Sequence, residues 1–328
     1  MSDRIRIGIA GYGNLGRGVE LALAQAPDMA LAAVFTRRDP GALKLQSAGV
    51  PVHGMDGIAD FTADIDVLIL CGGSRTDLPE QGPALAALFN TVDSFDTHAK
   101  IPEYFAAVDE AARRGNRIAV ISVGWDPGLF SLYRLYGEAL LPEGAGDTFW
   151  GKGVSQGHSD ALRRVPGVQN AVQYTVPSAE AMARARSGEC ANLSTREKHV
   201  RDCYVVLEAG ADAQAVRQAI VTMPDYFADY DTTVNFISAA ELQREHAAMP
   251  HGGYVIRSGT TGAGTRQMLE FGLKLESNPE FTASVLVAYA RAAYRLGKGG
   301  EVGARTVFDI APGLLSPKTA ADLRKELL

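Results

Sequence analysis

A glycine-rich turn near the start of the chain has the spacing of a dinucleotide-binding motif. The turn, Gly11-Tyr12-Gly13-Asn14-Leu15-Gly16, directly follows the apolar run 5–10 and leads into helical sequence. In a G-x-G-x-x-G turn, the first glycine permits the tight turn and the second lets the backbone approach a pyrophosphate. The third lets the helix pack closely on the strand. Because the first N–H groups of a helix favour an anion, the motif indicates a dinucleotide ligand.

The residues after the second expected strand, 29–36, indicate which dinucleotide is bound. An acidic side chain there would accept a hydrogen bond from the ribose 2′-OH of NAD, whereas guanidinium groups suit the 2′-phosphate of NADP. Here Thr36 is followed by Arg37 and Arg38, with no carboxylate before Asp39. We therefore predict NADP. The alternative is a glycine turn of another α/β unit beside a solvated arginine pair, since 35 of the 328 residues are glycine.

Two carboxylates, Asp96 and Asp126, closely follow expected strands of the same sheet. Strand exits of such a sheet face the nicotinamide, so polar residues there are the first candidates for chemistry. The pair could hold an ammonium group and accept the proton that an amine must lose before its lone pair can help to expel hydride. Asp126 could instead be a helix N-cap with Pro127 at the first position, and Asp96 could cap a turn before Ile101.

The second half of the chain offers further candidates for binding an anion. The segment Gly153–Asp160 is polar and rich in glycine, which suits a loop whose backbone N–H groups bind a carboxylate. An ordinary surface loop has the same composition. Arg201 and His251 could form a second anion site, or they could be solvated surface residues. The two tryptophans, Trp125 and Trp150, are typical of core or rim packing.

Composition excludes several classes of protein. A net charge of −6 argues against nucleic acid or an acidic membrane surface as partner. No apolar run approaches the ~18 residues of a membrane span, and the chain enters its first expected strand with no room for a signal peptide. The three cysteines are scattered without a C-x-x-C pair, and no spacing of ligand residues fits a metal site. We therefore expect a cytoplasmic protein with reduced thiols and no metal.

The elements that must position these residues alternate between strands and helices over residues 1–125. Apolar runs predict strands at 5–10, 29–36, 66–71, 91–95 and 118–122, with helices near 15–24, 79–89 and 104–114. The strand 66–71 ends in Gly72-Gly73-Ser74, at the carboxyl edge where such sheets bind ligands. This alternation is typical of a Rossmann-type doubly wound α/β sheet.

From about residue 126 the sequence changes to turn-rich stretches and β-branched runs, which indicate a second, mixed α+β domain. Helices are expected there at 178–186 and 212–221, and strands near 203–207 and 232–237. A helix is expected at 282–296, and a last one at 316–327 with Ser316 as N-cap and Pro317 at its first position. The predicted domains are therefore 1–125 plus about 279–328, and about 126–278.

Taken in order, these motifs resemble a known family. The chain is similar to the meso-diaminopimelate dehydrogenases, NADPH-linked amino acid dehydrogenases of bacterial lysine and cell-wall metabolism. The resemblance runs through nearly the whole chain, and its long Ser-Gln-Gly-His segment is far more specific than a glycine-rich turn. The matching segments are Gly11–Arg17, Thr36–Arg38, Trp125–Gly128, Phe149–Gly151, Ser155–Arg164, Pro166–Gln169, Thr222–Phe227, Met249–Gly253 and Asn278-Pro279.

The resemblance implies a role for each segment. NADP would be held by Gly11, Tyr12, Gly13, Asn14, Leu15, Gly16, Thr36, Arg37, Arg38, Cys71, Gly72, Gly73, Ser74 and Thr76. Asp96 and Asp126 would hold the amino group at the D-configured carbon and would be the catalytic pair. The pocket would be shaped by Trp150, the carboxylate of that centre would meet backbone groups of Gln156 and Gly157, and the distal L-end would meet Thr175, Arg201, His251 and Asn278. Two zwitterionic ends need two carboxylate receptors and two ammonium receptors.

The implied reaction is the reversible oxidative deamination of meso-2,6-diaminopimelate at its D-centre, to L-2-amino-6-oxopimelate and ammonia. The resemblance also implies a homodimer, with the second domain binding substrate and the partner. Two other functions stay open: a dehydrogenase for a broader range of D-amino acids on the same fold, and a non-catalytic NADP(H) sensor. A sensor would have no need for Arg201, Thr175 and His251 to converge on one pocket.

Overall fold

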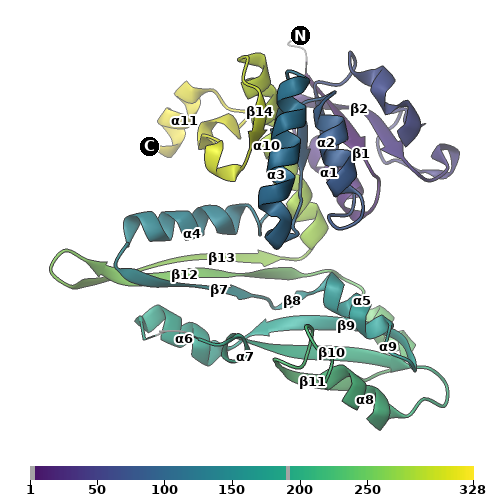
Figure 1. Ribbon diagram of the computed structural model, residues 1–328, viewed down its shortest axis with the longest axis vertical. Coiled ribbons are helices and arrows are strands. Elements are labelled where there is room, and N and C mark those ends of the chain that lie inside the picture. Colours follow the sequence, from purple (N-terminus) through teal and green to yellow (C-terminus); the bar gives the residue numbers. More distant parts are fainter. Residues whose placement is uncertain (1–3, 190–192) are drawn as a thin grey trace. The chain divides into compact units, whose positions relative to one another are not determined.

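The chain folds into two compact units, which are described separately (Figure 1). The computed structural model describes residues 4–189 and 193–328. Unit 1 comprises Met1–Leu132 and Pro279–Leu328, and unit 2 comprises Tyr133–Asn278. The C-terminal segment thus belongs to the same unit as the N-terminal strands.

Unit 1 is built on a seven-stranded parallel sheet with the order β14-β6-β5-β4-β1-β2-β3. Its strands are β1 (Ile5–Ala10), β2 (Met29–Thr36), β3 (Val52–Gly54), β4 (Val67–Leu70), β5 (Thr91–Asp93), β6 (Ile118–Val120) and β14 (Gly303–Arg305). The strand order reverses between β1 and β4, and ligands of doubly wound sheets bind at the carboxyl ends of strands at such a reversal. The predicted fold class is confirmed, and the short edge strands β3 and β14 are additional to the predicted ones.

Both faces of this sheet are buried under helices, which explains its continuous apolar strands. Helices α1 (Asn14–Ala24) and α10 (Asn278–Lys298) share one apolar cluster with Val67 and Ile69 of β4. Helices α2 (Leu78–Ala86) and α3 (Ile101–Arg114) share a second cluster with Leu68 and Leu70. Successive side chains of a strand point to opposite faces, so all four residues of β4 are buried. The unit is completed by α11 (Ala320–Leu327) and by short 3-10 helices at Pro40–Ala42, Met55–Phe61, His98–Lys100, Val307–Asp309 and Pro312–Leu314.

The alternative interpretation of Asp126 and Pro127 as a helix start is wrong. Helix α4 begins only at Leu129, after a turn in which Trp125 pairs with Gly128 and the Phe130 N–H donates to the Trp125 carbonyl. The turn satisfies the backbone groups that an N-cap at Asp126 would have served. Asp126 therefore lies in the loop between β6 and α4.

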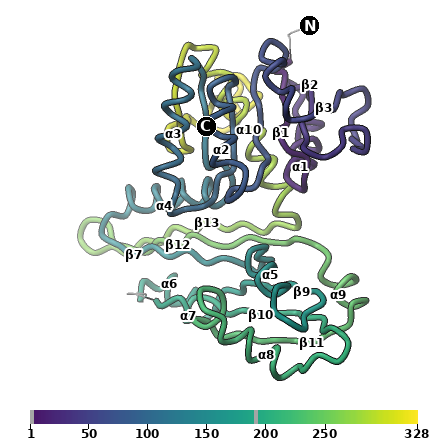
Figure 2. Tube along the Cα trace, turned by 45° about the vertical axis from the view of Figure 1, so that its right-hand side comes forward, coloured from purple at the N-terminus to yellow at the C-terminus, as the bar shows by residue number. Residues whose placement is uncertain are grey.

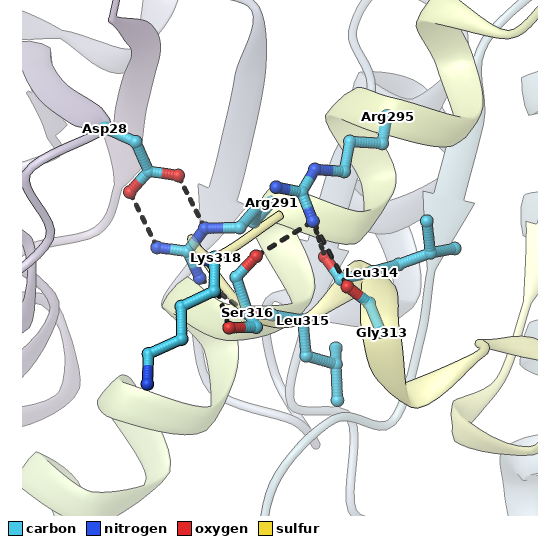
Figure 3. A network of polar contacts seen from close by, with 8 residues as sticks. All are labelled: Asp28, Arg291, Arg295, Gly313, Leu314, Leu315, Ser316 and Lys318. Atoms are coloured by element: carbon cyan, nitrogen blue, oxygen red, sulfur yellow. Dashed lines mark hydrogen bonds and ion pairs between the residues drawn. The ribbon is translucent and has the colours of Figure 1, made fainter. Parts of the chain in front are cut away.

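The last helix also starts later than Ser316 and Pro317 predict. Helix α11 begins at Ala320 and is capped by the Thr319 side chain, which accepts a hydrogen bond from the Asp322 N–H. The Ser316 carbonyl instead accepts a hydrogen bond of 2.9 Å from Arg295 on α10 (Figure 3). A tertiary contact therefore holds this segment outside the helix.

Arg291 of α10 is the centre of the polar network drawn in Figure 3. Its guanidinium is buried and donates to both carboxylate oxygens of Asp28, at 2.6 and 2.8 Å. A third donation, 2.6 Å long, reaches the Leu315 carbonyl. The hydrogen bond from Arg291 is the main reason that the pKa of Asp28 lies below its ordinary value. The network ties the start of β2, α10 and the C-terminal segment together.

We predict that Arg291→Met lowers the free energy of unfolding by about 3 kcal/mol, because it leaves Asp28 unpaired beside an apolar side chain. Arg295→Met, which removes only bonds to carbonyls, should cost about 1 kcal/mol and is the matched control. Chemical denaturation at several pH values measures both. Because the folded-state pKa of Asp28 is lowered, its stabilisation is present above its ordinary pKa and is lost as the pH falls through the lowered value. Equal losses for the two variants would contradict the prediction.

Unit 2 contains two sheets, as its mixed α+β sequence predicts. The four-stranded sheet has the order β11-β10-β9-β8, and the three-stranded antiparallel sheet has the order β13-β12-β7. The strands are β7 (Gly144–Trp150), β8 (Gly153–Val154), β9 (Val168–Pro177), β10 (His199–Leu207), β11 (Asp231–Phe236), β12 (His251–Thr261) and β13 (Thr265–Leu275). Figure 2 shows β12 and β13 as one long hairpin. Helix α4 (Leu129–Leu140) begins in the last residues of the first segment of unit 1 and continues into unit 2. The other helices of unit 2 are α5 (Gln156–Arg163), α6 (Ala179–Ser187), α7 (Thr195–Lys198), α8 (Ala213–Val221) and α9 (Ala239–Glu245).

The segment Gly153–Asp160 is not the loop that its glycines predict. Its first two residues pair with β9 as strand β8, and helix α5 starts at Gln156. The Ser155 side chain caps this helix by accepting from the His158 N–H. A serine in the N-cap position thus outweighs the low helix propensity of Gly157.

Candidate active site

Each glycine of the turn between β1 and α1 has a distinct local geometry. Gly11 has a φ of +96°, in the left-handed region, and a Cβ on it would lie 3.2 Å from the Cys71 carbonyl carbon. A Cβ on Gly16 would lie 2.2 Å from the Gly11 oxygen, so only glycine lets α1 pack here. No described atom lies within 4 Å of a Cβ placed on Gly13. The space beside Gly13, directly before α1 begins, is therefore open to an anion at the helix N-terminus.

The buried carboxylate of Glu20, which the sequence analysis did not single out, is hydrogen-bonded to this turn. Glu20 of α1 is 2% exposed; it accepts from the Tyr12 hydroxyl and, at 2.6 Å, from the Ser47 N–H. Burial raises the pKa of Glu20, but these hydrogen bonds outweigh it and leave the pKa below its ordinary value. The Tyr12 carbonyl accepts from the Arg38 guanidinium, and the Arg38 N–H donates to Thr36 Oγ1 at 3.1 Å. The turn and the basic pair are thus connected by hydrogen bonds.

Arg37 is held by a second carboxylate that the sequence reasoning also missed. Its Nη1 lies 2.8 Å from Oδ1 of Asp77, while Oδ2 of Asp77 accepts from the Gly73 N–H at 2.8 Å. Asp77 therefore joins the loop after β4 to the loop after β2. The only sign of this role in the sequence is that Asp77 comes four residues after Gly73, in the glycine-rich segment that follows the expected strand 66–71.

The loop after β4 reaches the loop that carries Asp96. Ser74 Oγ accepts from the Asp96 N–H at 2.9 Å and lies 3.1 Å from Thr97 Oγ1. Thr76 donates its N–H to Gly73 within the same loop. Burial raises the pKa of the Cys71 thiol, so this residue is a small apolar side chain and not a nucleophile. The predicted cofactor loop and the predicted ammonium receptor are thus neighbours in unit 1.

The two candidate carboxylates follow adjacent strands of unit 1. Asp96 lies after β5 and is exposed, and Asp126 lies after β6 and is partly buried. Carboxyl ends of neighbouring parallel strands meet at one edge of the sheet. The structure therefore brings both loops to the edge at which the glycine turn also lies.

In unit 2, Arg201 and Thr175 lie directly opposite each other on β10 and β9, and the guanidinium donates to Thr175 Oγ1. The ring of Tyr230 lies 3.7 Å from the guanidinium carbon. Arg201 is 6% exposed, and its Nε has no hydrogen-bond partner among the described residues. Burial lowers the pKa of Arg201, and the contact with Tyr230 opposes this effect. A buried guanidinium that makes no ion pair with a described carboxylate can bind an anion.

The sequence reasoning missed Tyr230. It directly precedes β11, in which Asp231 pairs with Val200 in a parallel register. That pairing places Tyr230 beside Arg201, but it joins segments too far apart in the chain for a sequence pattern to reveal.

Trp150 is supported by a buried histidine. The backbone N–H of Trp150 donates to Nε2 of His199 at 2.8 Å, and the two rings stack with centroids 5.4 Å apart. Burial, with Arg201 and Lys198 nearby, lowers the pKa of His199 to about 4, so the imidazole is neutral near pH 7. Trp150 itself is 38% exposed. A partly exposed indole that is held in place by the stacked His199 ring is suited to form the wall of a binding pocket.

Gln156 and Gly157 are the first two residues of α5, so their N–H groups lie among those that a helix leaves without an intrahelical partner. No described atom lies within 4 Å of a Cβ placed on Gly157. His158 bonds through Nδ1 to Ser155 Oγ at 2.8 Å, and burial followed by Arg201 lowers its pKa to about 4. The helix terminus, with its dipole, can bind a carboxylate through the backbone.

His251 lies at the start of β12, close to strand β8, which pairs with β9 at Thr175. A Cβ on Gly153 would lie 2.5 Å from His251 Nδ1, and Gly153 is paired with Thr175. Nδ1 accepts from the Gly252 N–H at 2.8 Å. Asn278 begins α10 and donates its N–H to the Met249 carbonyl at 2.9 Å. The structure thus brings Thr175, Arg201 and His251 together in unit 2.

The described residues include no group of three or more His, Cys, Asp or Glu that could hold a metal ion. Within that same part of the chain, no helix is long and apolar enough to cross a membrane.

The comparisons with known proteins agree with one another. Residues 124–277 match the family described as diaminopimelic acid dehydrogenase C-terminal domain. The chain is 66% identical over 324 residues to the meso-diaminopimelate D-dehydrogenase of Lysinibacillus sphaericus, covering 99% of each chain. It is 65% identical over 326 residues to that of Ureibacillus thermosphaericus, covering 99% of this chain and 100% of the relative.

Solved structures match over nearly the whole chain as well. A six-substitution mutant of the Clostridium tetani enzyme with DAP gives a TM-score of 0.93 at 56% identity, covering 99% of this chain and 100% of that one. The C. glutamicum DAP dehydrogenase in complex with DAP gives 0.91 at 48% identity, with the same coverage. An engineered D-amino acid dehydrogenase bound to NADP+ gives 0.85 at 46% identity, again with this coverage.

Proposed function

Because the chain belongs to the meso-diaminopimelate D-dehydrogenase family, we propose that it works with NADP as its cofactor and with the site residues described above. The family that the motifs predict is confirmed. The chain is a dehydrogenase that acts on a CH–NH2 donor and oxidatively deaminates meso-2,6-diaminopimelate. The glycine turn and the basic pair would hold NADP+, which would serve as the acceptor of a hydride. The substrate carbon that loses it becomes a C=N carbon, which water hydrolyses to a ketone and ammonia.

The observation that carries the site assignment is the buried Arg201. Its guanidinium is desolvated, is held flat against Tyr230 and makes no ion pair within the described residues. A carboxylate at the distal end of the substrate would supply the missing negative charge and accept from the same guanidinium. Thr175 accepts from this guanidinium, and His251 lies against Gly153, the residue paired with Thr175, so both offer further polar groups. An NADP(H) sensor has no use for such a receptor.

The six-substitution mutant of the Clostridium tetani enzyme supports this set. Its replaced residues are a Gln, a Thr, an Arg, a Pro, a His and an Asn. They follow one another at the same spacing as Gln156, Thr175, Arg201, Pro250, His251 and Asn278 here. Five of these six positions are in the predicted substrate site.

The roles at the reacting end follow from charge. The N-terminus of α5, at Gln156 and Gly157, binds the carboxylate next to the D-configured carbon. Asp96 and Asp126 bind the ammonium group, and one of them accepts its proton so that the nitrogen lone pair becomes available. Two charged receptors alone do not distinguish a D-centre from an L-centre, and the third constraint is the hydrogen that must face the hydride acceptor.

The residues fit NADP better than NAD. Arg37 and Arg38 follow β2, where a ribose 2′-substituent would lie, and Arg38 is fixed by the carbonyl of Tyr12. The accessible backbone at Gly13 suits the pyrophosphate. The NADP+-bound engineered neighbour supports the same cofactor. Initial rates with NADP and NAD should therefore differ in favour of NADP by at least about tenfold.

We also propose that the protein is a cytoplasmic homodimer. Unit 2 exposes large apolar side chains on α4 (Tyr133, Tyr136 and Leu140) and on β13 (Leu269), and the Tyr133 ring packs against Tyr136 and stacks on Phe271 at 3.6 Å. Such a cluster marks an interface more often than a free surface. The described cysteines are free thiols, which suits a reducing compartment. Light scattering coupled to gel filtration will give the oligomeric state.

The function is tested by following reduced nicotinamide with meso-, L,L- and D,D-diaminopimelate, D-lysine and D-alanine as separate substrates. We expect activity on the meso isomer and far less on substrates that lack a distal L-amino-acid end. Comparable rates on all D-amino acids would indicate the broader dehydrogenase. Tight NADPH binding without turnover of any of the five would indicate the sensor.

A further inference from the structure

Asp93 is a buried carboxylate at the end of β5 for which the proposed mechanism has no use. It is 1% exposed and lies at the carboxyl edge of the sheet, where β5 pairs with β6. Burial raises the pKa of Asp93 to about 6, although three hydrogen bonds act against this rise. Burying a carboxylate is unfavourable because the group loses its hydration, so we infer that Asp93 has a role other than packing.

The hydrogen bonds of Asp93 reach into two loops. Its Oδ1 accepts from the Phe95 N–H at 2.9 Å, in the loop after β5, and from the Ser122 N–H at 3.1 Å, in the loop after β6. The backbone adds a third link, because the Asp93 carbonyl accepts from the Val123 N–H at 2.8 Å. One residue therefore holds both strand exits.

Two further contacts stabilise this arrangement. Tyr104 of α3 donates its hydroxyl to Asp93 Oδ2 at 2.8 Å, and its ring stacks on Phe95 with centroids 4.0 Å apart. Ser122 has a φ of +57°, in the left-handed region that is unfavourable for a residue with a side chain. The bond from its N–H to Asp93 offsets that strain.

These loops are the ones that carry Asp96 and Asp126. Asp96 directly follows Phe95, and Asp126 follows Ser122 within the same short loop. We propose that Asp93 is a positioning residue, which fixes Asp96 and Asp126 relative to each other so that both meet one ammonium group. The proposal rests on the roles proposed for those two carboxylates. It assigns to Asp93 and Tyr104 a part in the reaction although neither touches the substrate.

The test compares Asp93→Ala with Asp93→Asn, which retains an oxygen that can accept from Phe95 and Ser122. We expect Asp93→Ala to lower kcat/KM for meso-diaminopimelate by about 10²-fold, as a displacement of about 1 Å would. Its dissociation constant for NADPH should stay within about twofold, because the contacts of the glycine turn are untouched. Asp93→Asn should recover most of the loss. Asp66→Ala is the matched control, since Asp66 also accepts a backbone N–H, from Arg6, but at the amino edge of the sheet.

Hydrogen exchange provides a readout that does not depend on turnover. In Asp93→Ala and in Tyr104→Phe, amides of segments 94–98 and 122–126 should exchange faster, while those of α1 should not change. If Asp93→Ala folds, exchanges like the parent and keeps its kcat/KM, the positioning role is wrong. If the parent itself does not turn over meso-diaminopimelate, the proposed function fails, and the exchange data still decide whether Asp93 holds the loops. An Asp93→Ala variant that does not fold leaves Tyr104→Phe to decide by the same two measurements.

Discussion

Replacing Asp126 with asparagine should lower kcat for meso-diaminopimelate by about 10²- to 10⁴-fold, the usual contribution of a general base. Asparagine keeps the size and one hydrogen-bond acceptor of the side chain, so the loop between β6 and α4 should keep its turn at Trp125 and Gly128. What it loses is the ability to take a proton. Steady-state kinetics over a range of pH measure the effect on kcat and KM separately.

Asp96→Asn is the matched comparison for this experiment. Asp96 is exposed, whereas Asp126 is partly buried, so Asp126 is the better shielded from water and the stronger candidate for the base. We expect Asp96→Asn to act mainly on KM, through weaker binding of the ammonium group. If Asp126→Asn changes KM alone and leaves kcat and its pH profile intact, water or another group accepts the proton.

The sequence predicts the first half of unit 1 closely because the determinants there are local. The strands Ile5–Ala10 and Met29–Thr36 have the predicted bounds, since apolar runs between glycine and arginine turns define them. The predicted helix at 316–327 is wrong at its start because Arg295, about one helical turn before the end of α10, binds the Ser316 carbonyl. A cap motif read from the sequence contains no information about such a distant donor.

The same distinction applies to the candidate site. Glycine turns and basic pairs are local patterns, so Gly11, Gly16 and Arg38 could be found from the chain alone. Tyr230 and Asp93 could not be found, because their importance depends on the parallel pairing of β10 with β11 and of β5 with β6. In the α5 segment, the N–H groups that are predicted to bind a carboxylate lie in the first turn of a helix and not in a loop.

Arg201→Met should lower kcat/KM for meso-diaminopimelate by on the order of 10²- to 10³-fold. The substitution removes the guanidinium that would pair with the distal carboxylate of the substrate in a buried site. Activity on D-lysine, which has no distal carboxylate, should change little, so the preference for the meso isomer should fall. Arg217→Met is the control, since Arg217 also lies over an aromatic ring, that of Phe236, and donates to the Val234 carbonyl in the same sheet.

Stability separates this binding role from a structural one. Burial without an ion pair lowers the pKa of Arg201, so the folded chain keeps this charge at a cost in the absence of substrate. Methionine fills similar space without that cost, and the free energy of unfolding of Arg201→Met should therefore equal or exceed that of the parent. A structural arginine would show the reverse, with lower stability and an equal loss of activity on both substrates. Because activity on meso-diaminopimelate should fall while stability should not, denaturation and kinetics on one variant decide whether Arg201 is kept for the fold or for the distal carboxylate.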